Sequence, residues 1–229
     1  MRVLLIDDHP LILMALRSVI EGRGEDVTVV DVEGGAAARA ALARDPDFDL
    51  VFLDLALADC DGFELLDDLR ARYPAVPVVV ISATERTSDV IRAIDAGAMG
   101  FVPKRSSHAG LYEALETVMR GGIYLPEPMM ALLSQPRAPA ADPAEPDTEP
   151  GVMYLHDHAA PEPHQQVGSI DRLGLTPRQK DVLALLLQGK PNKLIARELS
   201  LSVETVKDHV AAVLRALNVN SRTQAVLAV

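Results

Sequence analysis

The sequence of 229 residues has no tryptophan and a single cysteine, and each shortage excludes a kind of site. With Cys60 alone, the chain forms no internal disulfide and no zinc site built on cysteines. Aromatic residues make up only 3%, which argues against the stacking platforms that bind single-stranded nucleic acid.

Long apolar stretches are missing as well. No run approaches the roughly 18 apolar residues of a membrane-spanning helix. Near the N-terminus, only the apolar stretch Val3–Ile6 precedes two carboxylates, whereas a signal peptide needs about 7–15 apolar residues. The composition, 48% hydrophobic and 24% charged, is that of a globular chain with enough apolar mass for a core. We therefore expect a cytoplasmic protein with no membrane partner.

The net charge of −11 is unevenly distributed. Residues 1–135 hold 12 Lys and Arg against 22 Asp and Glu, residues 136–170 hold 1 against 6, and residues 171–229 hold 9 against 5. Because only the last segment is basic, only that segment is suited to contact a polyanion.

Proline marks a boundary, since seven of the sixteen prolines lie between residues 136 and 170. Proline removes backbone donors and fixes φ, so neither helix nor sheet propagates through such a stretch. The pattern predicts two domains, 1–125 and 171–229, joined by a Pro- and acid-rich linker over 126–170. A structured insertion is the alternative interpretation of this segment.

Before the linker, apolar runs alternate with helical patterns. The runs cover residues 3–6, 27–32, 50–55, 76–81 and 100–102, and the helical patterns cover 10–22, 35–44, 62–72, 85–96 and 107–120. The runs lack polar alternation, which is typical of parallel strands buried on both faces. We therefore predict an α/β fold, a doubly wound five-stranded parallel sheet, whose ligand site lies at the carboxyl ends of the strands.

After the linker the pattern is helical throughout. Thr176 followed by proline and Gln179 predicts a capped helix, and Gly189 is placed to end it. Asn192, Ser202 and Ser221 are the predicted caps of three further helices. Four short helices predict a small all-α domain at the C-terminus.

Polar side chains follow four of the predicted strands. Asp7 and Asp8 follow the first strand and Asp54 ends the third, while Ser82 and Lys104 follow the fourth and fifth. Three carboxylates at one sheet edge repel each other unless a cation joins them, and a hard ion such as Mg²⁺ fits oxygen ligands. Asp54 would then be a nucleophile for a phosphoryl group whose oxygens bind Mg²⁺, Lys104 and Ser82. Taken singly, each aspartate also fits a cap or turn residue.

The sequence over 1–125 closely resembles a two-component response regulator, in its flavodoxin-like receiver domain. The matching segments are 5–10 (LIDDHP), 51–55 (VFLDL), 80–83 (VISA) and 97–104 (GAMGFVPK). The DDHP start, together with the run GGIYLP at 121–126, is similar to the NarL/FixJ subfamily.

This resemblance implies roles for individual residues. Asp54 would take phosphate from a sensor histidine kinase, with Asp8 binding Mg²⁺ directly and Asp7 binding it through water. Asp54 itself and the backbone carbonyl of Ala56 would complete the protein ligands. Ser82 and Phe101 would form a switch pair.

Phe101 also fits a plain core aromatic, so its role in the switch is one of two interpretations. The loop after Asp54 departs from the family pattern as well, because Ala58 stands where proline is usual, although the expected Gly62 is present. This departure puts the rigidity of the loop and the dephosphorylation rate in doubt.

Residues 173–229 resemble a LuxR-type helix-turn-helix domain over nearly their whole length. The matching segments are 175–179 (LTPRQ), 189–196 (GKPNKLIA), 201–210 (LSVETVKDHV) and 220–225 (NSRTQA). The third helix would enter the major groove of double-stranded DNA.

We expect Thr205 and Lys207 to reach the DNA, and Lys193 and Arg222 to contact phosphates, the alternative being solvated surface residues. The resemblance also implies a dimer contact on the last helix, which includes Val226 and Leu227. Asp208 on the recognition helix would repel phosphate but could accept a hydrogen bond from cytosine. Because residues 171–229 carry a net charge of only +4, we expect modest affinity and a need for dimerisation.

The sequence thus predicts a phosphorylation-controlled transcription regulator, active as a homodimer when phosphorylated, and not an enzyme. One rival is a Mg²⁺-dependent phosphohydrolase, which needs an acid/base carboxylate two residues after the nucleophile, where Ala56 stands. The other rival is a constitutive DNA-binding protein whose N-terminal domain only dimerises.

Overall fold

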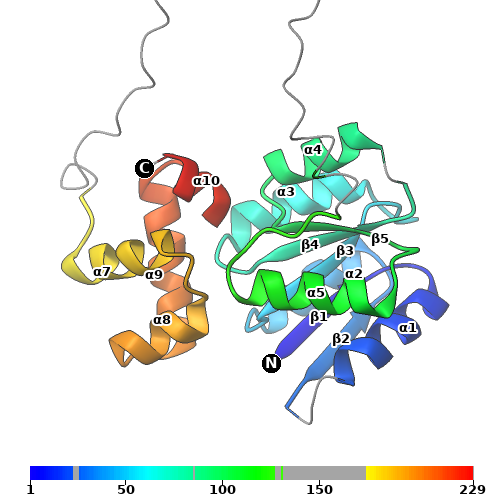
Figure 1. The fold of residues 1–229 in the computed structure, drawn as a ribbon, viewed down its shortest axis with the longest axis horizontal. Helices are drawn as coiled ribbons and strands as arrows, with labels where there is room; N and C mark the ends of the chain where they lie inside the picture. Colours follow the sequence, from blue (N-terminus) through cyan, green and yellow to red (C-terminus); the bar gives the residue numbers. More distant parts are fainter. Residues whose placement is uncertain (23–25, 85, 127–129, 131–173, 229) are drawn as a thin grey trace, which may run out of the picture.

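The computed structural model describes residues 1–22, 26–84, 86–126, 130 and 174–228. These residues form two units: a sheet unit within 1–126, and a helical unit within 174–228 (Figure 1). The predicted linker, 126–170, lies outside the described residues except for residues 126 and 130.

The sheet unit contains the expected five parallel strands in the order β2-β1-β3-β4-β5. The strands are β1 (Arg2–Ile6), β2 (Thr28–Val32), β3 (Leu50–Asp54), β4 (Val78–Ser82) and β5 (Gly100–Pro103). On β1, Leu4 pairs with Val30 of β2 on one side and with Val51 of β3 on the other. Every residue of β3 and β4 is buried, which explains their continuous apolar sequence. The fourth strand begins later than predicted, because Val76 is held in a turn by a hydrogen bond to the carbonyl of Tyr73.

Helices cover both faces of the sheet, so the doubly wound α/β prediction is confirmed. They are α1 (Pro10–Glu21), α2 (Gly35–Arg44), α3 (Gly62–Arg72), α4 (Thr87–Asp95) and α5 (His108–Met119). Side chains of α2, α3 and α4 pack in one core cluster with Leu4, Val51 and Val80. Side chains of α1 and α5 pack in a second cluster, on the residues that alternate with these along the strands.

The helical unit has the four predicted helices, α7 (Pro177–Leu187), α8 (Asn192–Leu199), α9 (Val203–Ala216) and α10 (Arg222–Ala228). The capping box of Thr176 and Gln179 is formed, and Ser202 caps α9 through the amide of Thr205. Asn192 was expected to cap α8, and this is wrong: Pro191 is the N-cap, and the Asn192 amide donates to the carbonyl of Ala75 at 3.1 Å instead.

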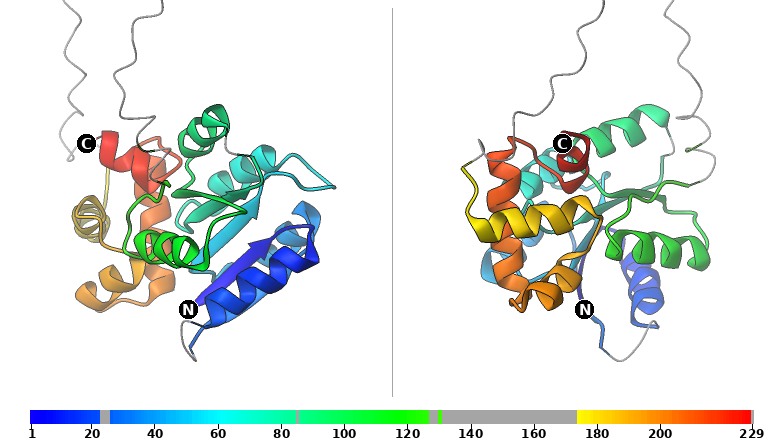
Figure 2. Two further views of the ribbon diagram at one scale, coloured as in Figure 1. Left: turned by 45° about the vertical axis from the view of Figure 1, so that its right-hand side comes forward. Right: turned by 60° about the vertical axis from the view of Figure 1, so that its left-hand side comes forward.

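The helical unit lies against one side of the sheet unit in all the ribbon views (Figures 1 and 2). Ala75, from the turn before β4, packs against the core cluster of the helical unit, and Gln224 of α10 donates to the carbonyl of Asp95 at 2.9 Å. Among the described helices, we find none that is both long and apolar enough to cross a membrane.

Candidate functional site

An acidic pocket lies at the carboxyl edge of the sheet, where the ends of the strands converge. Asp54 is the last residue of β3 and Asp7 directly follows β1; they are 1% and 2% exposed, and Asp8 is partly buried beside them. β1 and β3 are neighbours in the sheet, which is why residues 47 positions apart in sequence share one site. The sheet topology therefore produces the predicted cluster.

Lys104 supplies the positive charge of this pocket from the segment after β5. Its Nζ lies 2.7 Å from Oδ2 of Asp54, to which it donates a hydrogen bond, and 2.8 Å from Oδ2 of Asp7. Burial lowers the pKa of Lys104, but its close contacts with the carboxylates of Asp54 and Asp7 outweigh burial, so the net shift is upward. Lys104 therefore stays charged and offsets part of the repulsion between the two carboxylates.

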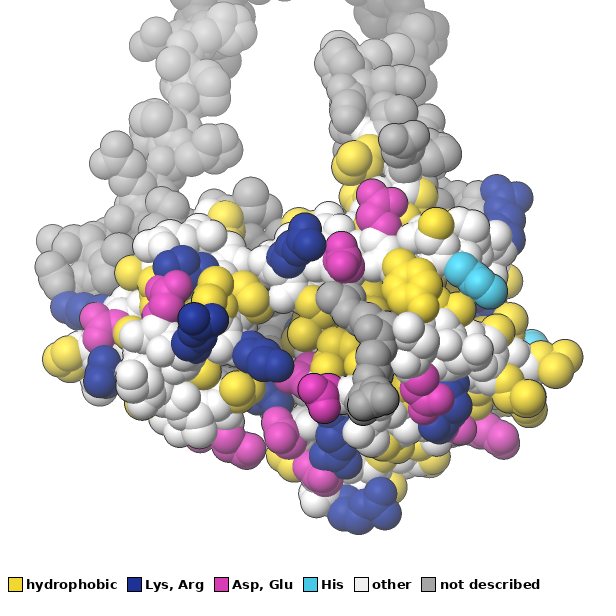
Figure 3. Space-filling view, turned by 60° about the horizontal axis from the view of Figure 1, so that its bottom comes forward, with side chains coloured by type: hydrophobic (Ala, Val, Ile, Leu, Met, Phe, Trp, Pro, Cys, Tyr) yellow, Lys and Arg dark blue, Asp and Glu magenta, His cyan; other side chains and the backbone are white. Residues whose placement is uncertain are grey.

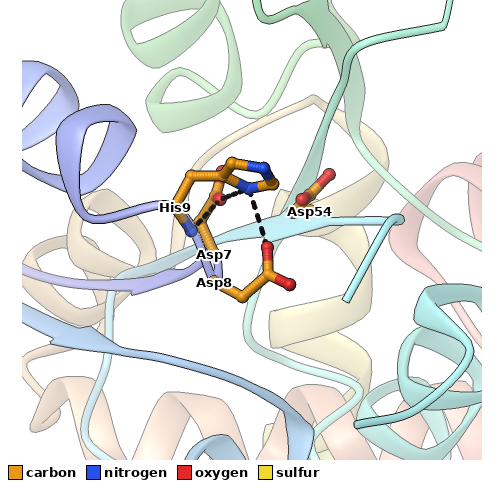
Figure 4. Close-up of side chains that lie close together, drawn as sticks. All are labelled: Asp7, Asp8, His9 and Asp54. Atoms are coloured by element: carbon orange, nitrogen blue, oxygen red, sulfur yellow. Dashed lines mark hydrogen bonds and ion pairs between the residues drawn. The ribbon is translucent and has the colours of Figure 1, made fainter. Parts of the chain in front are cut away.

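The remaining oxygen ligands of the pocket fit a hard cation. Ligand atoms of Asp7, Asp8, His9 and Asp54 all lie within 4.8 Å of one another (Figure 4). Among the residues that the structure describes, no hydrogen bond of good geometry reaches the buried Oδ2 of Asp7 or Oδ1 of Asp8, although Lys104 and His9 are close to them. Buried oxygens with free lone pairs are ready metal ligands, so the donor set suits Mg²⁺.

His9 belongs to this cluster and was not singled out from the sequence. Its Nδ1 lies 2.7 Å from Oδ1 of Asp8 and 3.1 Å from Oδ1 of Asp7 (Figure 4). The sequence feature that could have pointed to His9 is its position directly after Asp7 and Asp8. The imidazole is largely exposed, so it covers the entrance of the pocket rather than its floor.

Ser82, the last residue of β4, is 3% exposed at the same edge of the sheet. Its hydroxyl lies 3.2 Å from the hydroxyl of Thr84, and it also accepts from the Thr84 backbone amide. Thr84 in turn donates to the Asp89 carboxylate of α4 at 3.0 Å. A hydrogen-bond chain that sequence reasoning missed thus connects Ser82 to α4.

Phe101 is fully buried in the core cluster beneath α2, α3 and α4. A plain core aromatic is expected in such a position. A switch residue whose ring is turned into the core fits the position as well. Ala56 lies two residues after Asp54, and its backbone amide donates to Oδ1 of Asp54 at 3.2 Å. This contact fixes the first turn of the loop next to the acidic pocket.

Lys207 on α9, a predicted DNA contact, is engaged by the sheet unit. Its Nζ lies 2.5 Å from Oδ1 of Asp47, and its side chain is only 12% exposed. Asp47 precedes β3, far from α9 in the sequence. No local pattern around Asp47 therefore predicts its ion pair with Lys207. Thr205, also on α9, is partly buried, and its hydroxyl lies 2.8 Å from that of Ser202.

Lys193 is exposed at the start of α8, whereas Arg222 is bound within the helical unit. The guanidinium of Arg222 donates to the carbonyl of Leu186 at 3.1 Å and to that of Lys190. Burial lowers the pKa of Arg222 to about 10. Arg222 therefore holds the segment between α7 and α8, a role that the prediction of a phosphate contact did not include.

The helical unit shows no unbroken basic patch on the side drawn in Figure 3. On the side drawn in Figure 3, Lys and Arg side chains are interspersed with Asp and Glu. Val226 of α10, a predicted dimer contact, is 46% exposed, while the side chain of Leu227 lies outside the described part of the chain.

A cavity separates the two units around these contacts. It is lined from the sheet unit by residues that include Arg70, Met99 and Val118, and from the helical unit by Lys193, Lys207 and Arg222. Arg70 is 3% exposed and donates to the carbonyls of Tyr73, Pro74 and Val76, and burial lowers its pKa to about 10. The contact between the units is thus partly hollow, and both apolar and charged side chains line the hollow.

Comparison with protein families identifies both units. Residues 3–116 match the response regulator receiver domain, and residues 173–229 match the bacterial regulatory proteins of the luxR family. The two matches fall on the sheet unit and the helical unit described above.

Individual relatives agree over the whole length. The chain is 33% identical over 228 residues to the glycerol metabolism activator of Pseudomonas putida, covering 99% of this chain and 93% of that protein. It is 33% identical over 224 residues to the nitrate/nitrite response regulator NarL of Escherichia coli K12, covering 97% and 92%. A solved structure of the RcsB response regulator of Salmonella typhimurium shares the fold, with a TM-score of 0.55 at 22% identity over 99% of this chain and 98% of that one. The chain therefore belongs to the NarL-type response regulators, transcription regulators in which a receiver domain is joined to a LuxR-type DNA-binding domain.

Proposed function

We propose that this regulator accepts a phosphoryl group on Asp54 from a sensor histidine kinase and changes its dimerisation and DNA binding in response. A carboxylate oxygen of Asp54 would attack the phosphorus of a phosphohistidine, the N–P bond would break, and the leaving imidazole would take a proton from water. The observation that carries this proposal is the convergence of Asp7, Asp8 and Asp54 on one point with Lys104 beside them.

The other residues of the pocket would bind the transferred group. Asp8 would hold Mg²⁺ directly and Asp7 would hold it through water, with Asp54 and the Ala56 carbonyl as further ligands. When bound, Mg²⁺ supplies positive charge that neutralises the phosphoryl oxygens. Lys104 already contacts Asp54 and would follow the phosphoryl group, and the Ser82 hydroxyl would donate to it.

Movement of the Ser82 hydroxyl toward the phosphoryl group would be transmitted to α4 and β5 through the neighbours of Ser82. Thr84 connects Ser82 to Asp89 of α4, so a change at Ser82 reaches the helix directly. Phe101, buried on the adjacent strand β5, would act as the second switch residue. The residue two positions after Asp54 is Ala56, whose side chain is neither an acid nor a base. This supports a phosphoryl acceptor rather than a phosphohydrolase.

The acceptor is tested with a small phosphodonor. We expect Asp54→Asn to abolish phosphate uptake from acetyl phosphate in Mg²⁺, measured by phosphate-affinity gel electrophoresis of the intact chain. Asp67→Asn is the matched control, because Asp67 is an exposed aspartate on α3 of the same domain. A phosphorylated Asp54→Asn variant would contradict the assignment.

For the output domain, we propose that α9 enters the major groove of double-stranded DNA, with Thr205 and Lys207 near the bases and Lys193 and Arg222 near phosphates. Lys207 is bound to Asp47 of the receiver domain, so it is withheld from DNA in this arrangement. Phosphorylation would release the helical domain from the receiver domain. The helical domain would then dimerise through α10, which includes Val226 and Leu227. We place the domain boundaries at 1–125, 126–170 and 171–229, and the site of action in the cytoplasm.

A further inference from the structure

The loop that joins Asp54 to α3, residues 55–61, carries Ala56 next to the acidic pocket. The base of this loop is closed by a β-bridge between Ala56 and Asp61 and by a hydrogen bond of 3.3 Å from the amide of Gly62 to the carbonyl of Leu55. The loop contains no proline, and Ala56, Ala58 and Asp59 are exposed. These contacts at the base leave the tip of the loop to be held by other means.

Asp59 at the tip of the loop contacts a different helix. Its carboxylate accepts a hydrogen bond from the amide of Gly35 at 2.9 Å and another from the amide of Ala36 at 3.0 Å. Gly35 and Ala36 are the first two residues of α2, and the N-cap of that helix, Gly34, has no side chain to cap them. Asp59 therefore caps α2 from 23 residues away in sequence.

The two glycines before and at the start of α2 fit closely around this tip. A Cβ at Gly34 would lie 2.7 Å from Oδ1 of Asp59, and a Cβ at Gly35 would lie 2.3 Å from Sγ of Cys60. Gly34 has a φ of 130°, which side chains rarely adopt. The start of α2 is thus shaped to receive Asp59 and Cys60, independently of the two hydrogen bonds.

Of the two partners, α2 is the fixed one. Ala38, Ala41 and Leu42 are buried in the core cluster, whereas the loop packs on that cluster only with the partly buried Leu55, Leu57 and Cys60 and exposes its other residues to water. The amides of Ala36 and Gly35 also hold the pKa of Asp59 below its usual value, so the carboxylate stays charged at neutral pH. The contact therefore restricts the loop more than it restricts the helix.

We propose that Asp59 is a positioning residue that holds the loop after the phosphoryl acceptor, and with it the Ala56 carbonyl, in place for the metal. This inference rests on the proposed function of Asp54. Asp59 replaces the rigidity that a proline at position 58 would supply, where this chain has Ala58. Asp59 contacts neither metal nor phosphate; it acts on them through the backbone between residues 56 and 59.

Loss of the contact is tested in the intact chain with Asp59→Ala and Asp59→Asn. In Asp59→Ala, we expect the Mg²⁺ concentration for half-maximal phosphorylation by acetyl phosphate to rise about tenfold, the scale seen when residues that orient metal ligands are lost. The maximal rate should change little, because Asp54, Lys104 and Ser82 are untouched. Asp59→Asn keeps one acceptor oxygen and should give an intermediate rise.

Two further measurements separate positioning from a merely structural role. Amide hydrogen exchange should speed up across residues 55–61 in Asp59→Ala, and calorimetric titration with Mg²⁺ should show the same loss of affinity without phosphodonor. Adding Ala58→Pro to Asp59→Ala should restore slow exchange and Mg²⁺ affinity, since proline lowers the freedom of the loop by another route.

The control is Asp67→Ala, which removes the same charge from an exposed site on α3. Mg²⁺ affinity in Asp59→Ala equal to that in Asp67→Ala would overturn the inference. So would faster exchange confined to the first turn of α2, or a proline variant that regains slow exchange without regaining affinity. A wild-type chain that takes no phosphate and binds no Mg²⁺ would contradict the proposed function instead. Hydrogen exchange of the loop in Asp59→Ala would still show whether the contact between Asp59 and α2 holds the loop.

Discussion

The acidic pocket and the residues predicted to contact DNA differ in how their surroundings are determined. Asp7, Asp54 and Ser82 are at most 3% exposed, and the parallel order of β1, β3 and β4 fixes where they meet. Lys193, Lys207 and Arg222 lie on helices, and their partners come from elsewhere: solvent, Asp47 of the other domain, and backbone carbonyls. Sheet topology thus specifies a site more completely than a helix surface does.

This difference also separates what each cation does. Lys104 sits between two buried carboxylates and offsets part of their repulsion. Lys207 pairs with Asp47, an exposed aspartate of the receiver domain, and in the proposed function it would exchange this partner for a DNA phosphate. We therefore expect changes in the pocket to alter folding and metal dependence, and changes on the helices to alter DNA binding.

The largest expected effect follows from removing Lys104. In Lys104→Met, Asp7 and Asp54 face each other without a cation, and the free energy of unfolding in EDTA should fall by about 3 kcal/mol, as for a broken buried pair. Mg²⁺ should restore part of this loss, so that the metal stabilises the variant more than it stabilises the wild-type chain. Urea unfolding with and without Mg²⁺ measures both quantities.

Arg120→Met is the control for Lys104→Met, because Arg120 is exposed and pairs with the exposed Glu116, one turn earlier on the same stretch of chain. It should cost at most about 1 kcal/mol, with no dependence on Mg²⁺. Equal stability of Lys104→Met and the wild-type chain in EDTA would mean that the two carboxylates tolerate each other without the ammonium.

A smaller effect distinguishes the two predicted phosphate contacts. Arg222→Gln should lower the free energy of unfolding by about 1–2 kcal/mol, since the part-buried carbonyls of Leu186 and Lys190 lose their donor. Lys193→Gln should leave folding unchanged but weaken binding to a DNA duplex and reduce its log–log salt slope by about one. Chemical denaturation and fluorescence anisotropy with an arbitrary labelled duplex give the two readouts, because phosphate contacts do not depend on sequence. The reverse outcome, a stable Arg222→Gln with a reduced salt slope, would restore Arg222 as a phosphate contact.

The smallest effect concerns the contact between the domains. Asp47→Ala frees Lys207, and the unphosphorylated chain should bind duplex DNA about threefold more tightly, the worth of one exposed ion pair. Anisotropy titrations at low salt measure this change. Asp26→Ala removes the same charge from another exposed site of the receiver domain, so it controls for the general repulsion between an acidic protein and DNA. Identical affinities of these two variants would show that Asp47 does not withhold Lys207.

Much of the fold could be predicted because the relevant signals are local. Continuous apolar runs at Val51 and Val80 indicate buried strands, and Thr176 with Gln179 indicates the start of a helix. The clustering of Asp7 with Asp54 also follows, because parallel strands end at one edge. Their roles in binding metal and phosphate stay predictions.

The remaining features depend on contacts between distant segments, which leave no periodic trace. Asp59 reads as an ordinary loop residue until its partner at Gly35 is known, and Asp47 reads as surface until α9 lies beside it. Asn192 was expected to cap its own helix, but it is already the first helical residue, and its side-chain amide donates to the carbonyl of Ala75 in the other unit. Arg222 likewise is a surface cation in the sequence and a bound one in the fold.

The ion pair between Lys207 and Asp47 has a thermodynamic consequence that runs in both directions. If adding phosphate to Asp54 loosens this pair and favours DNA, then linkage requires DNA to favour the phosphorylated form by the same factor. Promoter DNA would then shift the phosphorylation equilibrium of the receiver domain, although it binds to the helical domain. Molecules already seated on their operator would hold phosphate more firmly than free ones, and occupancy of the genome would feed back on the signal that brought it about.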